Sequence, residues 1–232
     1  MSETASHFQS KGVLVSLELL SVFLLTCTQI SSFFFVSLCP FSVPIPKQVS
    51  EQISDIAYEL HRLSTLTGKS FVRQLELITQ YKGFIPIEGE SSIFHIGMEQ
   101  DKDYQSLIDA ARKAVDQGYS VYILPNPRNC RTADFIFKKK SSYTMYDLKT
   151  VSGKGSVGTQ LLDSIGQSNR VLLNITSDYN ARLLAADIRT YFESNRQAVE
   201  VLLFKGKKTI SVNRYAVQSP LFHKQFRKKY EK

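Results

Sequence analysis

Apolar residues recur at helical spacing after Gln48, and this pattern predicts an amphipathic helix that ends near Gly68. Its apolar positions are Val49, Ile53, Ile56, Leu60 and Leu63. A second helix, which ends before Gly83, is predicted from the apolar positions Phe71, Leu75 and Ile78. We interpret residues 47–83 as a helical element that packs against the rest of the chain or presents a surface to a partner.

Residues 84–232 alternate between strand and helix patterns, and we interpret them as one domain. An extended region over Gly83–Gly97 precedes a helix with Gly118 as its C-cap and with Tyr104, Leu107, Ala111 and Ala114 on one face. Strands are predicted over Ser120–Leu124, Ala133–Lys138, Tyr143–Val151, Arg170–Thr176 and Val199–Phe204. Further elements are helices from about Ser156 to Ser168 and over Ala181–Glu193, then a strand in "TISVNRY" and a basic tail. This order contains αβββαβ and predicts an α/β fold, with a mixed β-sheet flanked by helices.

An uncharged apolar segment, Leu19–Cys39, sets residues 1–46 apart from the rest of the chain. Its 21 residues are enough to cross a bilayer, which needs about 20. Three interpretations stay open: a membrane anchor that gives the protein a membrane contact, an atypical secretion signal, or an incorrectly assigned start. The prolines of "CPFSVPIPK" stop any helix and make that stretch a linker. The sequence leaves the cellular location open.

The chain is basic, with a formal net charge of +8 from 29 basic and 21 acidic residues. One basic and two acidic residues fall within 1–46, which leaves 28 basic and 19 acidic residues in the remainder. This excess of basic residues suits nucleic acid or an anionic membrane as a partner. The alternative is a soluble protein whose surface is basic without such a partner. The cysteines Cys27, Cys39 and Cys130 form no disulfide framework or zinc motif, and the four histidines have no ligand spacing.

Two acids on consecutive predicted strands are the candidate chemistry: Asp134 and Asp147, with Lys149 two residues later. Strand side chains alternate, so Asp147 and Lys149 share a face, which Asp134 reaches if the two strands pair. Two carboxylates and a backbone carbonyl, that of Leu148, form a hard oxygen site for Mg²⁺ or Mn²⁺. Such an ion polarises a phosphoryl oxygen, and Lys149 would position water or stabilise charge on the phosphate. By itself, an Asp-Leu-Lys triplet is more often part of a solvated strand face than of a catalytic site. The second acid and the order of helices and strands favour the catalytic interpretation.

The order αβββαβ with Asp134 and then Asp147-Leu-Lys149 resembles the PD-(D/E)xK nuclease superfamily. The stretches "GYSVYILP", "TADFIF", "YDLKTVSG" and "QLLDSIGQSNRVLLNI" are more specifically similar to the C-terminal nuclease domains of contact-dependent growth inhibition (CdiA-type) toxins. The similarity spans about Phe94–Ile175. It implies a restriction-endonuclease-like core and a metal-dependent nuclease that acts in a cytoplasm on tRNA in preference to DNA. It also implies a cognate immunity protein as partner. The proline that often precedes the first acid is Ala133 here.

The resemblance also assigns roles. The two aspartates would be metal ligands and the lysine catalytic, and the superfamily often adds an acid from the first helix. Asp103 is the best placed for that catalytic role among Glu99, Asp103 and Asp109. Gln160 and Gln167, seven residues apart, are predicted to share a helix face, and similar sequences have glutamines there that would contact a phosphate or base. The alternative is that both are ordinary surface glutamines.

Other residues are candidates for contacts with nucleic acid. Lys154 lies in the loop "SGKGSVGT", whose backbone amides would touch a phosphate, and Lys139 lies in the basic turn Lys138–Lys140. Further basic residues and tyrosines that would stack on bases are Lys205, Lys207, Lys208, Arg214, Lys224, Arg227, Lys228, Lys229, Tyr143, Tyr146 and Tyr215. Neither this loop nor "TGKS" at Thr67–Ser70 has the order of an ATP-binding P-loop, so an ATPase is rejected.

The expected function is therefore a Mg²⁺-dependent endonuclease that hydrolyses phosphodiester bonds, with tRNA or other RNA as substrate and a toxin as its setting. One alternative is a non-catalytic, basic nucleic-acid-binding or mobile-element structural protein, which would bind with steep salt dependence and cleave nothing. Another is a membrane-anchored interaction protein, in which Leu19–Cys39 spans the bilayer and the body binds a partner.

Overall fold

The computed structural model describes residues 56–232 except 64–65, 98–102, 126–131 and 154–155. The chain divides into two units, Met1–Val43 and Pro44–Lys232, and every described residue lies in the second. The apolar segment Leu19–Cys39, with the membrane contact expected of it, therefore lies outside the described residues. Within the described part, no helix is both long and apolar enough to cross a bilayer.

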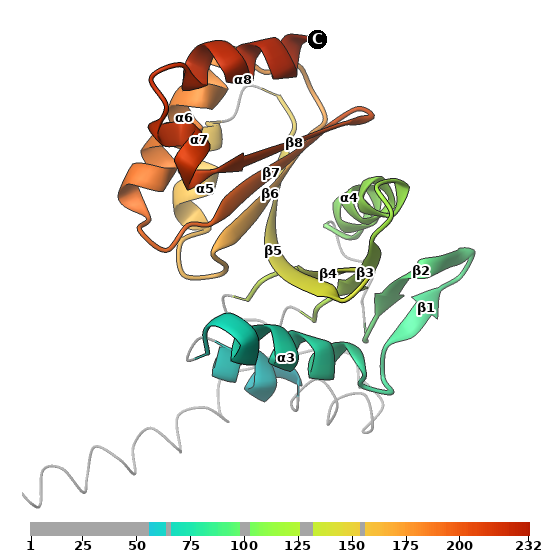
Figure 1. Cartoon of the computed structure of the whole chain (residues 1–232). Helices are drawn as coiled ribbons and strands as arrows, with labels where there is room; N and C mark the ends of the chain where they lie inside the picture. Colours follow the sequence, from blue (N-terminus) through green and yellow to red (C-terminus); the bar gives the residue numbers. More distant parts are fainter. Residues whose placement is uncertain (1–55, 64–65, 98–102, 126–131, 154–155) are drawn as a thin grey trace, which may run out of the picture. The chain divides into compact units, whose positions relative to one another are not determined.

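A mixed β-sheet runs through the described part of the chain, with its eight strands adjacent in sequence order (Figure 1). Neighbouring strands are parallel at β2–β3, β5–β6 and β6–β7, and antiparallel at the other four contacts. The strands are β1 (Ile85–Ile87), β2 (Glu90–His95), β3 (Ser120–Ile123), β4 (Phe135–Lys139), β5 (Ser142–Val151), β6 (Arg170–Ile175), β7 (Glu200–Lys205) and β8 (Lys208–Asn213).

Helices flank this sheet, so the predicted α/β fold is confirmed, and α4-β3-β4-β5-α5-β6 is the predicted αβββαβ order. The helices are α3 (Gly68–Thr79), α4 (Tyr104–Asp116), α5 (Val157–Asp163), α6 (Ala181–Ser194), α7 (Arg214–Gln218) and α8 (Phe222–Glu231). Residues 56–63 are also helical. Their buried residues Ile56, Leu60 and Leu63 join those of α3 in one cluster with the sheet residues Ile136, Tyr143 and Met145.

Alternation along β5 defines two faces of the sheet. Tyr146 and Leu148 pack in one cluster with apolar residues of α4. Met145 and Val151 project to the opposite face, where Met145 packs with α3 and Val151 packs with α5 and α6. Figure 1 shows α4 on one side of β5–β7 and α5 and α6 on the other. We refer to these as the α4 face and the α3/α6 face.

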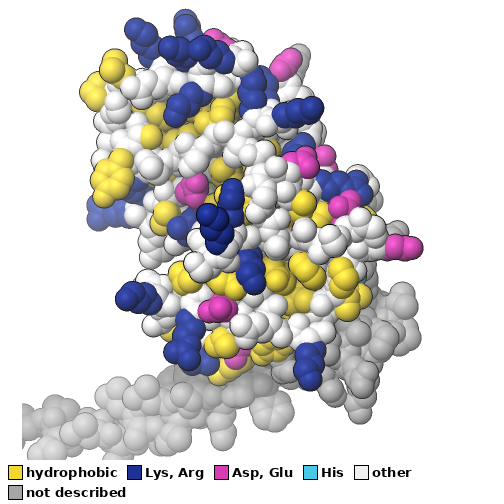
Figure 2. Space-filling view, turned by 45° about the vertical axis from the view of Figure 1, so that its right-hand side comes forward, with side chains coloured by type: hydrophobic (Ala, Val, Ile, Leu, Met, Phe, Trp, Pro, Cys, Tyr) yellow, Lys and Arg dark blue, Asp and Glu magenta, His cyan; other side chains and the backbone are white. Residues whose placement is uncertain are grey.

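The C-terminal segment that the sequence presents as a basic tail is helix α8. Phe222, Phe226 and Tyr230 recur every four residues and are buried against the core with Leu184 and Ile188 of α6. The basic residues of the segment point outward, and they form a row along the top of the molecule in Figure 2. The tail is therefore an amphipathic helix that completes the core on the α3/α6 face.

Gly118 has the predicted role at the end of α4. It follows the C-cap residue Gln117 with a φ of +81°, a conformation that residues with a Cβ disfavour. A Cβ at this position would meet nothing closer than the Lys139 side chain at 3.9 Å, so the cost of a side chain is confined to the backbone. We expect Gly118→Ala to lower the free energy of unfolding by about 1 kcal/mol in urea denaturation. Unchanged stability would contradict the left-handed conformation.

Candidate functional site

The β4–β5 hairpin brings Asp134 beside Asp147. Phe135 pairs with Tyr146 in the strand register, and just before it the backbone N–H of Asp134 donates to the carbonyl of Tyr146 at 3.0 Å. The N–H of Leu148 then donates to Asp134 Oδ2 at 2.6 Å. The first aspartate is thus anchored to the backbone of the strand that carries the second one.

Asp147 and Lys149 occupy the polar stretch of β5 between Met145 and Val151, which belong to two different apolar clusters of the α3/α6 face. The Asp147 side chain is 1% exposed, and Lys149 Nζ lies 2.8 Å from its Oδ2 and 3.1 Å from its Oδ1. Only the contact with Oδ1 has hydrogen-bond geometry, so the buried Oδ2 has no hydrogen-bond donor. The prediction that Asp134, Asp147 and Lys149 come together on one face is confirmed.

The two carboxyl groups interact strongly. Burial and the negative charge of Asp147 raise the pKa of Asp134 to about 7, although the Leu148 N–H and Lys149 oppose the shift. Burial also raises the pKa of Asp147, against the charge of Lys149 and a hydrogen bond from Asp134. Near neutral pH the pair therefore retains a proton, which Asp134 donates to Asp147. Like charges held this close raise the pKa of one of the two groups, and a bound divalent cation would oppose that shift.

This donor set fits a divalent cation of the Mg²⁺ type. Its oxygen atoms are hard ligands, Asp147 Oδ2 is buried without a hydrogen-bond partner, and the two carboxyl groups compete for a proton that a cation would replace. Among the described residues, no group of three or more histidine, cysteine or acidic side chains is arranged to hold a metal ion. The proposed contribution of the Leu148 carbonyl stays a prediction.

The acid from the first helix does not join the pair. Helix α4 packs on the α4 face, whereas Asp134 and Asp147 lie on the α3/α6 face. Asp103 is exposed at the N-cap of α4, and Asp109 is bound by Lys113 and Asn174. Glu99 lies outside the described residues. The structure thus corrects the expected position of Asp103, because the helix that carries it packs on the opposite side of the sheet.

The two glutamines do not share a helix. Gln160 lies in α5, on the α3/α6 face, and its Oε1 is buried without a hydrogen-bond donor. Helix α5 ends at Asp163, four residues before Gln167, and Gly166 continues the chain with a φ of +91°. Gln167 instead donates from Nε2 to the carbonyl of Asp163. The prediction of a shared face is therefore wrong, and a contact of Gln160 with substrate stays a prediction.

The candidate lysine Lys139 is bound away from the carboxylate pair. Lys139 donates to the carbonyl of Gln117 at 2.7 Å, and its Nζ lies 4.8 Å from the ring centroid of Tyr119. It therefore ties the β4–β5 turn to the end of α4. Lys154 lies outside the described residues, so its phosphate contact stays a prediction.

One polar network was not anticipated from the sequence. Asn174 of β6 is completely buried on the α4 face; its Oδ1 accepts from Lys113 Nζ at 2.8 Å, and its Nδ2 donates to Asp109 Oδ2 at 2.8 Å. Lys113 also donates to Asp109 Oδ2 at 2.8 Å. The signal in the sequence was a lone amide within the apolar strand "RVLLNIT".

Comparison with known proteins adds little to this geometry. No protein-family model and no curated protein matches the chain. Among solved structures, the chain is similar to one from a CdiA-CT/CdiI toxin and immunity complex from Burkholderia pseudomallei. The TM-score is 0.32 and the identity 14%, over 50% of this chain and 91% of that chain. A similarity of this degree does not assign a function, so the roles of Asp134, Asp147 and Lys149 rest on their arrangement.

Proposed function

We propose that this protein is a metal-dependent nuclease and that the pair Asp134–Asp147, with Lys149, is its catalytic centre. The observation that carries the proposal is the buried carboxylate pair with a raised Asp134 pKa and an ammonium group 2.8 Å from Asp147. Two buried carboxylates that compete for one proton destabilise a fold unless a cation compensates their charge, and groups with such shifted pKa values cluster at functional sites.

Each residue has a distinct part in this proposal. Asp134 and Asp147 hold Mg²⁺ or Mn²⁺, and the bound ion supplies polarisation of a phosphoryl oxygen and a lowered pKa for water. The Leu148 N–H fixes the orientation of Asp134. Lys149, which is 19% exposed and so reachable from solvent, stabilises the charge that develops on the phosphate. Gln160, whose buried Oε1 lacks a donor, would contact the substrate from α5.

The proposed substrate is RNA, with tRNA preferred to DNA. This preference and the setting of a toxin with a cognate immunity protein follow from the sequence resemblance over Phe94–Ile175. The charge supports a nucleic acid in general, because exposed Lys224, Arg227, Lys228 and Lys229 form the outer side of α8.

The test is cleavage of total tRNA and of plasmid DNA by the full-length protein, with Mg²⁺, with Mn²⁺ and with EDTA. We expect that tRNA is cut in the presence of the metal but not in EDTA, and that DNA is cut more slowly or not at all. Gel electrophoresis of the products measures both rates. Cleavage that continues unchanged in EDTA would contradict the metal-dependent mechanism.

The same assay addresses the second candidate function, a basic nucleic-acid-binding protein without catalysis. The outward row of lysine and arginine side chains on α8 favours it, because phosphate contacts alone give binding (Figure 2). Binding of tRNA that weakens steeply with salt, without any cleavage in Mg²⁺ or Mn²⁺, would select this alternative.

A further inference from the structure

A second polar site lies on the α4 face, at the carboxyl ends of the parallel strands β5, β6 and β7. A cavity of about 510 Å³ opens there between α4 and the sheet. It is lined by Gln105, Ser106, Asp109, Lys113, Thr150, Asn174, Ile175, Thr176 and Gly206. None of the three proposed catalytic side chains lines it. In open α/β sheets the carboxyl ends of parallel strands are the usual place for ligands.

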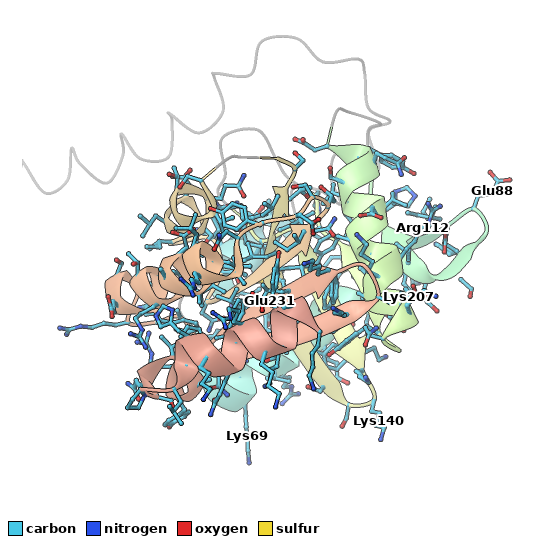
Figure 3. The ribbon with its side chains drawn as sticks, turned by 90° about the horizontal axis from the view of Figure 1, so that it is seen from above. Lys69, Glu88, Arg112, Lys140, Lys207 and Glu231 are labelled. Atoms are coloured by element: carbon cyan, nitrogen blue, oxygen red, sulfur yellow. The ribbon has the colours of Figure 1, made fainter. Side chains whose placement is uncertain are left out.

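A second cavity of about 390 Å³ shares the lining residues Lys113 and Gly206 with the first, so the two are adjacent, and we name them together the α4 groove. Lys207 and Lys208 line this second part. Figure 3 shows Lys207 at the turn between β7 and β8, beside α4. The groove thus extends from a polar cavity toward a pair of lysines.

The floor of the cavity is built from fixed polar groups. Asn174 is completely buried and is held on both sides of its amide by Lys113 and Asp109. Thr150 Oγ1 is buried and has no hydrogen-bond partner, although Thr150 lines the cavity. A buried hydroxyl without a partner costs stability unless a ligand or water satisfies it. A ligand or water in the cavity would give this hydroxyl the partner that it lacks.

Asp109 gives the cavity one ionised acceptor. Burial alone would raise its pKa, but hydrogen bonds from Lys113 and Asn174 lower the pKa overall. Its side chain is 43% exposed and lines the cavity, so the carboxylate could accept a hydrogen bond from a ligand there. Hydroxyl and amine groups are the partners that such an acceptor selects, and the 2′-hydroxyl of a ribose is a common one.

We propose that the α4 groove binds a nucleoside phosphate, with ribose and base in the cavity and the phosphate toward Lys207 and Lys208. Uncharged donors and acceptors beside a carboxylate suit the hydroxyl and base edges, and the lysines suit the phosphate. Thr150 follows Lys149 directly on β5 and projects from the other face of the sheet. The nucleotide would belong to the RNA substrate, on the other side of β5 from the catalytic pair, and this part of the proposal rests on the proposed function. Binding of a nucleoside phosphate does not depend on the proposed function.

The test measures equilibrium binding of AMP, GMP, CMP and UMP to the full-length protein in EDTA, by isothermal titration calorimetry, with inorganic phosphate as a further probe. We expect saturable binding of at least one mononucleotide that is tighter than binding of phosphate. Thr150→Val, which removes only the hydroxyl, and the double variant Lys207→Ala/Lys208→Ala should each weaken it about fivefold or more. Lys69→Ala, an exposed lysine on α3, should leave it unchanged.

A five-nucleotide single-stranded RNA, also in EDTA, distinguishes the source of the nucleotide. Tighter binding of this RNA than of the mononucleotide, with the same sensitivity to Thr150→Val, identifies a substrate chain, and equal affinity identifies a free nucleotide. No mononucleotide binding, or binding that neither variant weakens, would overturn the proposal. EDTA prevents metal-dependent cleavage, so the binding assay is independent of the cleavage assay. Nucleotide binding without cleavage in the separate assay would refute only the proposed nuclease. Cleavage without nucleotide binding would refute only the proposed nucleotide site in the α4 groove.

Discussion

Asp147→Asn is expected to lower the rate of tRNA cleavage by roughly a thousandfold or more while the protein stays folded. The change keeps the shape of the side chain but removes the charge that holds both the cation and Lys149. The measurement is the initial rate of cleavage in Mg²⁺, beside far-UV circular dichroism of the variant. Retention of full activity would remove Asp147 from the site and with it the proposed mechanism.

Two further measurements separate catalysis from folding in this experiment. Asp163→Asn, at an exposed carboxylate at the end of α5, is the matched control and should retain the wild-type rate. Mn²⁺ should raise the melting temperature of the wild-type protein but not that of Asp147→Asn, because ligand binding stabilises only a fold that contains the site. Equal shifts in both proteins would place the cation elsewhere.

Much of the fold could be predicted because the signals are local. The strands that carry Asp134 and Asp147 are short apolar runs around a basic turn, and a hairpin of that length places the two acids near each other. Helix α8 also had a local signal, the four-residue spacing of Phe222, Phe226 and Tyr230. The many charged residues of this segment obscured the signal, because the apolar stripe of the helix consists of only a few large aromatic residues.

The remaining features depend on contacts that no local pattern contains. Nothing in the sequence of α4 says which face of the sheet it covers, and this choice separates Asp103 from the carboxylate pair. The same choice creates the contact of Asp109 with Asn174, 65 residues away. The spacing of Gln160 and Gln167 predicts a shared face only if the helix continues, and α5 ends between them.

Asp134→Asn is expected to stabilise the metal-free protein at pH 8 and to abolish cleavage. Asn keeps the acceptor for the Leu148 N–H, and its amide donates to Asp147 as the protonated Asp134 does. The variant therefore resembles the protein with Asp134 protonated at every pH, and it lacks the repulsion between two buried carboxylates. At pH 8, above the pKa of about 7, wild-type Asp134 must ionise beside Asp147.

The dependence on pH has a definite sign. A carboxyl whose pKa rises from 3.8 in the unfolded chain to about 7 in the folded protein binds its proton more tightly when folded, so wild-type stability falls as pH rises from about 4 to about 7. The gain from Asp134→Asn should thus be close to zero near pH 4 and reach roughly 1–3 kcal/mol at pH 8. Urea denaturation in EDTA at both values measures it. Lower stability of the variant at pH 8 would mean that Asp134 serves mainly as an anchor for β5. Higher stability together with lost cleavage is the result expected of a carboxylate pair that functions in catalysis.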